Sequence, residues 1–147
     1  MKQLLVLILS MSFFVSFAQR DNQNLKNGVI AKGYDVVSYF NNKAEKGLKT
    51  YSYTYNNATY KFTNEDHLKT FKQNPEKYMP QYGGYCAYAI ALKGEKVDIN
   101  PNAFEVRDGK LYLFYKTVFA NTLKAWKKEN PNKLVNDANK NWAKIIE

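Results

Sequence analysis

Cysteine and histidine are almost absent from this chain of 147 residues. Cys86 is the only cysteine and His67 is the only histidine. A single cysteine excludes an internal disulfide, and one residue of each kind is too few for a closed structural zinc site. Cys86 must therefore be a packed thiol, a metal ligand, a redox-active thiol or one half of an intermolecular bridge.

Acidic residues are also scarce, with 13 Asp and Glu against 22 Lys and Arg, for a net charge of +9. The lysines are spread along the chain and there is no Arg-rich tract. We therefore interpret the charge as a solvated basic surface and expect no nucleic-acid partner. The chain also lacks a Gly-rich phosphate loop and a Ser-His-Asp pattern, so the sequence indicates no enzyme class.

Long apolar runs are limited to the first residues. Lys2 precedes an apolar stretch over 4–17, and small residues at Ser16 and Ala18 stand three before and one before a possible cut. This layout predicts a signal peptide over 1–18. The run falls short of the roughly 20 apolar residues that a membrane span needs. We expect an exported protein, periplasmic or extracellular, with no membrane span after cleavage.

The rest of the chain predicts one small domain. We expect a loose segment over 19–31 and a folded domain over 32–147, with a fold of the α+β class in which antiparallel hairpins are packed by several helices. Alternation predicts hairpins over 51–62, with an Asn56-Asn57-Ala58 turn, and over 104–115, with an Asp108-Gly109 turn.

Helix signals occupy the segments between and after the hairpins. A capping residue at Thr63 or Asn64 predicts a helix over 63–71, and Pro75 opens a shorter one. Residues 85–92 fit helix or strand, and their alanines favour helix. Two later helices are predicted from stripes of apolar residues at helical spacing, namely Phe119, Leu123 and Trp126, and then Leu134, Ala138, Trp142 and Ile145.

Several motifs carry a family resemblance. The segments are Tyr60-Lys61-Phe62-Thr63, Phe71, Asn74-Pro75-Glu76-Lys77-Tyr78, Gly33-Tyr34-Asp35, Ser38-Tyr39-Phe40, Pro80-Gln81-Tyr82-Gly83-Gly84-Tyr85-Cys86-Ala87 and Asp108-Gly109-Lys110-Leu111-Tyr112-Leu113. Over roughly residues 32–145 the chain resembles the YHS domain family, and in particular its small exported group named YHS domain-containing (seleno)proteins. YHS domains occur in heavy-metal handling proteins, so the resemblance implies a role in metal handling.

The chain departs from the metal-handling relatives at their cysteines. The family's cysteine positions fall at Thr63, His67 and near Val37 or Ser38, and its His-Ser pair falls at Tyr51 and Ser52. Only His67 keeps ligand chemistry at a ligand position. The group's name implies selenocysteine in some members, and a match at Cys86 would favour a reactive nucleophile there.

The leading hypothesis is an exported accessory protein that binds or handles a soft metal, with copper(I) as the first candidate and Cys86 central. His67 and Met79 are the other candidate ligands, and a metal ion or a redox or metal-handling protein is the expected partner. A helix start at Cys86 would favour thiolate, so a thiol-redox protein is the alternative, with His67 as a base for Cys86. The third reading is a non-catalytic binding module with a packed cysteine.

Overall fold

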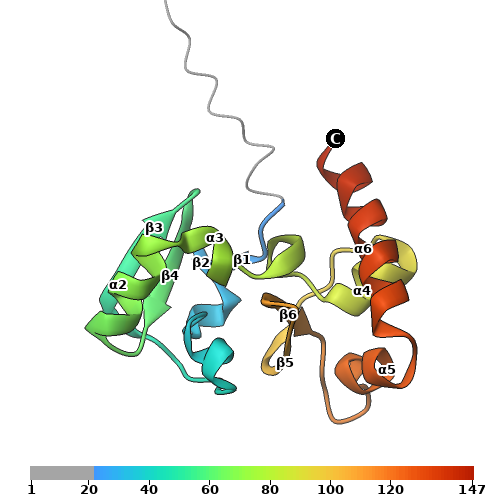
Figure 1. Cartoon of the computed structure of the whole chain (residues 1–147), viewed down its shortest axis with the longest axis horizontal. Helices are drawn as coiled ribbons and strands as arrows, with labels where there is room; N and C mark the ends of the chain where they lie inside the picture. Colours follow the sequence, from blue (N-terminus) through green and yellow to red (C-terminus); the bar gives the residue numbers. More distant parts are fainter. Residues whose placement is uncertain (1–21) are drawn as a thin grey trace, which may run out of the picture.

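The computed structural model describes residues 22–147, and the predicted signal peptide lies outside the described residues. These residues form one small α+β domain, as predicted, with two sheets and five α-helices in the described part. Figure 1 shows two halves side by side: strands β1–β4 with helices α2 and α3, and strands β5–β6 with helices α4–α6.

The first sheet has the order β1-β2-β4-β3, with strands β1 (Leu25–Lys26), β2 (Val29–Ile30), β3 (Leu48–Tyr55) and β4 (Ala58–Phe62). β2 pairs with β4 in parallel, and the other pairs are antiparallel. Asn56 and Asn57 connect β3 to β4 with φ of 47° and 63°. Two left-handed residues in a two-residue turn are typical of hairpins, so the predicted hairpin is confirmed.

Residues 22–31 follow an ordered path, whereas the sequence predicted a loose segment over 19–31. Asn27 and Gly28, with φ of 52° and 78°, allow the tight turn between β1 and β2. Asn24 donates its backbone N–H to Gly83 at 2.8 Å, and Ile30 is 1% exposed in the core. The polar residues that suggested looseness find partners distant in the chain: the Gln23 side chain donates to the Asn56 carbonyl at 2.7 Å, and the Asn24 side chain donates to Asp98 at 2.9 Å.

Helix α2 (Glu65–Gln73) covers the β3–β4 hairpin and is followed by α3 (Pro75–Tyr78). The Asn64 side chain caps α2 by accepting the His67 N–H at 2.8 Å. Phe71 is fully buried, and its ring lies 4.4 Å from that of Tyr60 on β4. This cap and this contact fix the position of His67, in the first turn of α2, relative to the sheet.

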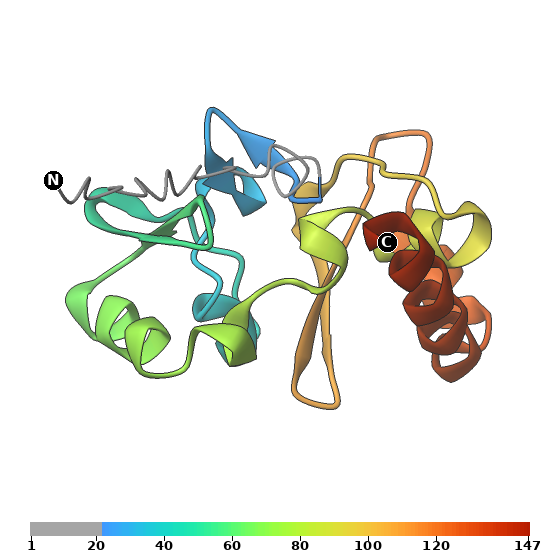
Figure 2. The ribbon, with the colours of Figure 1, turned by 90° about the horizontal axis from the view of Figure 1, so that it is seen from above.

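The second half is built on a hairpin of β5 (Asn100–Arg107) and β6 (Lys110–Phe114). Its turn residues Asp108 and Gly109 have φ of 50° and 71°, which confirms the predicted hairpin. Figure 2 shows this hairpin between the first sheet and a helical layer. That layer comprises α4 (Ala87–Lys93), α5 (Thr122–Lys128) and α6 (Pro131–Ile146).

The helix predicted from the Phe119 stripe begins later than its spacing indicated. α5 starts at Thr122, where the Asn121 side chain accepts the Lys124 N–H at 3.1 Å. Phe119 lies in the preceding loop and is 98% exposed, so its assignment to a buried helical stripe is wrong. Because Asn121 is the N-cap of α5, the helix does not extend back to Phe119.

Two clusters of buried residues form the core: the first lies mainly in the first half but includes Leu111 and Leu113 of β6, and the second lies among β5, β6 and the helices of the second half. Cys86 belongs to the first cluster and Ala87 to the second, so the chain crosses between them at this point. The Tyr39 hydroxyl also joins the halves by donating to the Pro101 carbonyl at 2.7 Å. Within residues 22–147, no helix combines the length and apolar character that crossing a bilayer requires.

Candidate functional site around Asp35 and His67

A fully buried carboxylate, Asp35, organises a polar cluster in the first half. Its Oδ1 accepts the backbone N–H groups of Val37 at 2.9 Å and Ser38 at 3.2 Å. This is a turn cap two residues after Gly33. Its Oδ2 accepts both the backbone N–H and the hydroxyl of Thr63, at 2.8 and 2.9 Å. The cap thereby ties the loop before β3 to the end of β4.

His67 makes the fifth contact of this carboxylate. Its Nδ1 lies 2.6 Å from Asp35 Oδ2, a short distance typical of a charge-assisted hydrogen bond. The two positions are separated by 32 residues, and α2 brings them together. Asp35 is 0% exposed and the His67 side chain is 20% exposed, so the ring lies at the edge of the core.

The contact assigns different roles to the two nitrogens of the His67 ring. Asp35 accepts from four other donors, so the hydrogen-bond network places a proton on Nδ1 that points at the carboxylate. No protein atom in the described chain bonds Nε2, and no buried side-chain nitrogen or oxygen there lacks a partner. Nε2 must therefore face solvent, and in the neutral ring it carries the free lone pair.

Two hydroxyl groups complete the surroundings of Nδ1. Thr63 Oγ1 lies 3.3 Å from it and Ser38 Oγ lies 3.5 Å from it. Ser38 donates its hydroxyl proton to Glu45 at 2.8 Å. In a Ser-His-Asp triad the serine faces the nitrogen that the aspartate does not use. Ser38 lies near Nδ1, the nitrogen that already bonds Asp35, so Ser38, His67 and Asp35 do not form a triad.

Cys86 occupies a different environment, where it is 0% exposed. Its Sγ accepts the Tyr115 N–H at 3.3 Å and lies 3.3 Å from Thr122 Oγ1. Thr122 gives its own proton to the Tyr115 carbonyl at 2.8 Å, so the thiol donates to the Thr122 oxygen. Both hydrogen-bonding functions of the thiol are satisfied inside the protein.

Met79, the third predicted ligand, lines a groove of about 480 Å³ together with Ile30, Tyr60 and Trp142. Cys86 bonds Tyr115 and Thr122, His67 bonds Asp35, and in the described chain no hydrogen bond joins Cys86 to His67. Nor do residues 22–147 contain a group of three or more His, Cys, Asp and Glu side chains that could hold a metal ion.

Sequence reasoning named Asp35 and His67 separately and missed that they form a pair. Asp35 comes two residues after Gly33 and resembles an ordinary turn cap, and His67 resembles a surface residue of a helix. Predicting the pair would have required knowing that the end of β4 lies beside the turn that Asp35 caps. The chain itself shows no spacing that encodes it.

Comparisons with known proteins identify no relative of this chain. No protein-family model, no curated protein and no solved structure matches the chain. The resemblance to the YHS domain family therefore stays a prediction from the sequence.

Proposed function

We propose that the protein is an exported accessory protein that binds a soft metal ion, copper(I) first, through Nε2 of His67. The observation that carries the proposal is the 2.6 Å contact between Asp35 and His67 Nδ1. Metal-binding histidines typically donate their other ring N–H to a carboxylate, which fixes the tautomer and raises the basicity of the ligand. Export rests on the predicted signal peptide.

The proposal gives Asp35 a positioning role, because its two oxygens already accept five hydrogen bonds. His67 then supplies one nitrogen ligand, and the remaining ligands come from water or from a metal-handling partner. Imidazole suits copper, whereas a thiolate would suit copper(I) better. The sequence put Cys86 at the centre for that reason, but burial of its thiol favours His67 as the accessible ligand.

A non-catalytic binding module with a packed cysteine is the second candidate. It is favoured by the 0% exposure of Cys86 and by the two satisfied hydrogen bonds of its thiol. The thiol-redox alternative requires local opening around Thr122 before a reagent can reach Sγ. The first candidate differs from both in predicting copper affinity that depends on His67.

Copper(I) competition with a coloured chelator, under anaerobic conditions, tests the proposal on the protein lacking residues 1–18. We expect His67→Ala to weaken binding at least tenfold and Cys86→Ser to leave it unchanged. Asp35→Asn should weaken binding by about 10- to 100-fold, because the amide can donate to Nδ1 and move the ring proton to Nε2. Met79→Leu is a volume-matched control for the third candidate ligand.

Three outcomes contradict the proposal. Absence of copper binding by the wild type would leave the binding module as the better answer. Loss of affinity in Cys86→Ser with none in His67→Ala would return the site to the thiol. Unchanged affinity in a folded Asp35→Asn variant would show that the carboxylate does not position a metal ligand.

A further inference from the structure

The loop between β6 and α5 exposes two adjacent large apolar side chains. Val118 is 92% exposed and Phe119 is 98% exposed, whereas the other exposed large apolar residues of the described chain lie between 51% and 53%. Single exposed apolar residues are ordinary on protein surfaces. A neighbouring pair held almost wholly in water suggests a partner that covers it.

The loop is held in shape by its own hydrogen bonds. The Thr117 hydroxyl accepts the N–H groups of Phe119 at 3.3 Å and Ala120 at 3.1 Å, and the Thr117 N–H donates to the Ala120 carbonyl at 2.7 Å. Lys116 and Asn121 close the base of the loop as an isolated bridge. The apolar pair therefore stands at the tip of a fixed turn and cannot collapse onto the domain without breaking these bonds.

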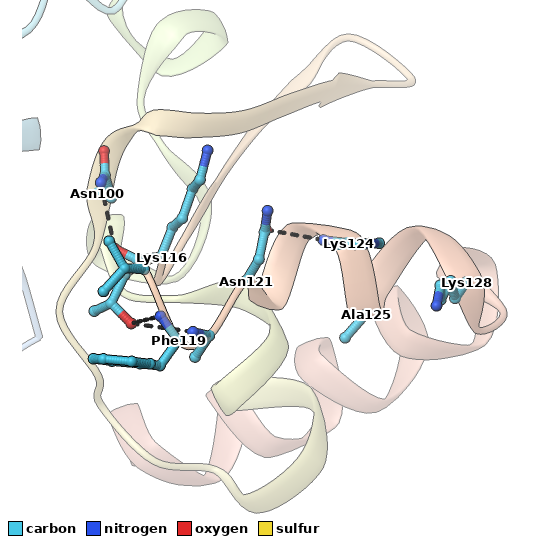
Figure 3. Close-up of a pocket in the computed structure, with 10 residues that line it drawn as sticks. Asn100, Lys116, Phe119, Asn121, Lys124, Ala125 and Lys128 are labelled. Carbon is cyan, nitrogen blue, oxygen red and sulfur yellow. Dashed lines mark hydrogen bonds between the residues drawn. The ribbon is translucent and has the colours of Figure 1, made fainter.

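Positive charge surrounds this tip. Lys116, Lys124 and Lys128 line an open hollow of about 910 Å³ that also includes Val118 and Phe119 (Figure 3). Lys124 and Lys128 lie four residues apart on one face of α5. From residue 109 to residue 128 the sequence has no acidic residue. None of these three lysines forms an ion pair within residues 22–147.

The first carboxylate after this basic stretch belongs to Glu129, and it is already engaged. Its Oε1 accepts the Tyr88 hydroxyl at 2.6 Å. A neutral hydroxyl leaves the charge of Glu129 in place, but within residues 22–147 no ion pair joins Glu129 to these three lysines. We name the surface formed by Lys116, Val118, Phe119, Lys124 and Lys128 the basic tip.

We propose that the basic tip docks onto an anionic phospholipid surface, with Val118 and Phe119 entering the interface and the three lysines contacting phosphates. The arrangement matches the layers of a membrane, where charged headgroups overlie an apolar interior. A protruding two-residue tip fits such a layered surface better than it fits a protein interface, which buries a broad patch of about 800 Å² per partner. This inference does not depend on the role of His67.

Vesicle co-sedimentation with the protein lacking residues 1–18 tests the proposal. The probes are vesicles of pure phosphatidylcholine and vesicles containing about one third phosphatidylglycerol. We expect binding to the second kind only, weakened by salt. Since one lysine near an anionic leaflet contributes about fivefold, Lys116→Gln with Lys124→Gln and Lys128→Gln should reduce binding by more than tenfold.

Two matched controls separate the tip from total charge. Lys43→Gln with Lys46→Gln and Lys49→Gln removes the same charge from an exposed surface in the other half, and should reduce binding far less. Val118→Ala with Phe119→Ala keeps the charge and should reduce binding several-fold, whereas Leu48→Ala with Leu92→Ala should not. Phe119→Trp should give a blue-shifted fluorescence component on binding that the wild type lacks.

Equal losses from the two lysine triples would reduce the effect to general charge and overturn the proposal. Unchanged binding after removal of Val118 and Phe119 side chains, in variants with wild-type circular dichroism, would also overturn it. So would absence of vesicle binding by the wild type. If the wild type instead binds polyglutamate through the basic tip, the surface serves an acidic protein and the lipid assignment is wrong.

Discussion

In the first half, the Asp35 side chain accepts hydrogen bonds from more backbone N–H groups than any other side chain. It is fully buried and pairs the N–H groups of Val37, Ser38 and Thr63. A buried donor left without a partner costs about 1–3 kcal/mol. The carboxylate is therefore a structural requirement of the fold as well as the partner of His67.

Asp35→Ala should lower the free energy of unfolding by about 3–5 kcal/mol, because several buried donors lose their acceptor together. Urea denaturation followed by circular dichroism measures the loss. Asp137→Ala is the control: Asp137 pairs with Lys133 at 2.6 Å on the exposed face of α6, and its loss should cost under about 1 kcal/mol. Equal costs for the two variants would contradict the role assigned to Asp35.

Burial of Cys86 should limit the reactivity of its thiol. With 0% exposure, the native thiol should react with a thiol reagent only through opening of the fold, at a rate that rises with denaturant. Cys86→Ser should destabilise the protein by about 1–3 kcal/mol, since a hydroxyl replaces sulfur in an apolar setting. Stoichiometric labelling of the native protein within seconds would contradict a packed thiol and revive the redox hypothesis.

At the scale of elements, local rules account for what the sequence predicted correctly. Both hairpins follow from alternation and from turn residues that accept positive φ, as at Asn57 and Gly109. The helix at 85–92 was ambiguous, and α4 takes the helical option from Ala87 onward. The helix predicted to include Phe119 begins later in the structure, because residue spacing does not show where an N-cap starts a helix. The Asp35–His67 pair was out of reach because tertiary packing alone joins them.

Trp126 is the element-scale anchor of α5. It is 0% exposed, its ring lies 5.3 Å from that of Phe114 on β6, and its Nε1 donates to Glu105 on β5 at 2.8 Å. Trp126→Ala should therefore cost about 3–5 kcal/mol in denaturant unfolding. Trp142 on α6 is only partly buried, so Trp142→Ala should cost less, although the sequence placed both on apolar stripes. A larger loss at Trp142 would contradict this order.

At the scale of the whole molecule, the two halves should unfold together. The backbone N–H of Asn24 reaches Gly83, the Tyr39 hydroxyl reaches Pro101, and Leu111 and Leu113 of β6 pack in the first core cluster. These contacts join elements that are far apart in the chain. Breaking either core removes partners from the other, which is the condition for one cooperative transition.

Among the buried tyrosines, Tyr39, Tyr60 and Tyr82 make this cooperativity measurable at high pH. Burial, first of all, raises the pKa of Tyr39, Tyr60 and Tyr82 well above the ordinary value of 10.0. Tyr39 and Tyr60 belong to the first core cluster and Tyr82 to the second. In the unfolded chain all three lose their protons near pH 10, whereas in the folded protein they keep them.

Stability should therefore be intact below about pH 10 and fall above it, because there the folded state binds more protons than the unfolded state. Each tyrosine contributes a slope of about 1.4 kcal/mol per pH unit, so three give about 4 kcal/mol per unit. Absorbance at 295 nm should show Tyr39, Tyr60 and Tyr82 losing their protons in one step that coincides with loss of circular dichroism. In a Tyr82→Phe variant, Tyr39 and Tyr60 should still titrate in a single step with unfolding. Separate steps for the two core clusters would mean that the halves unfold independently.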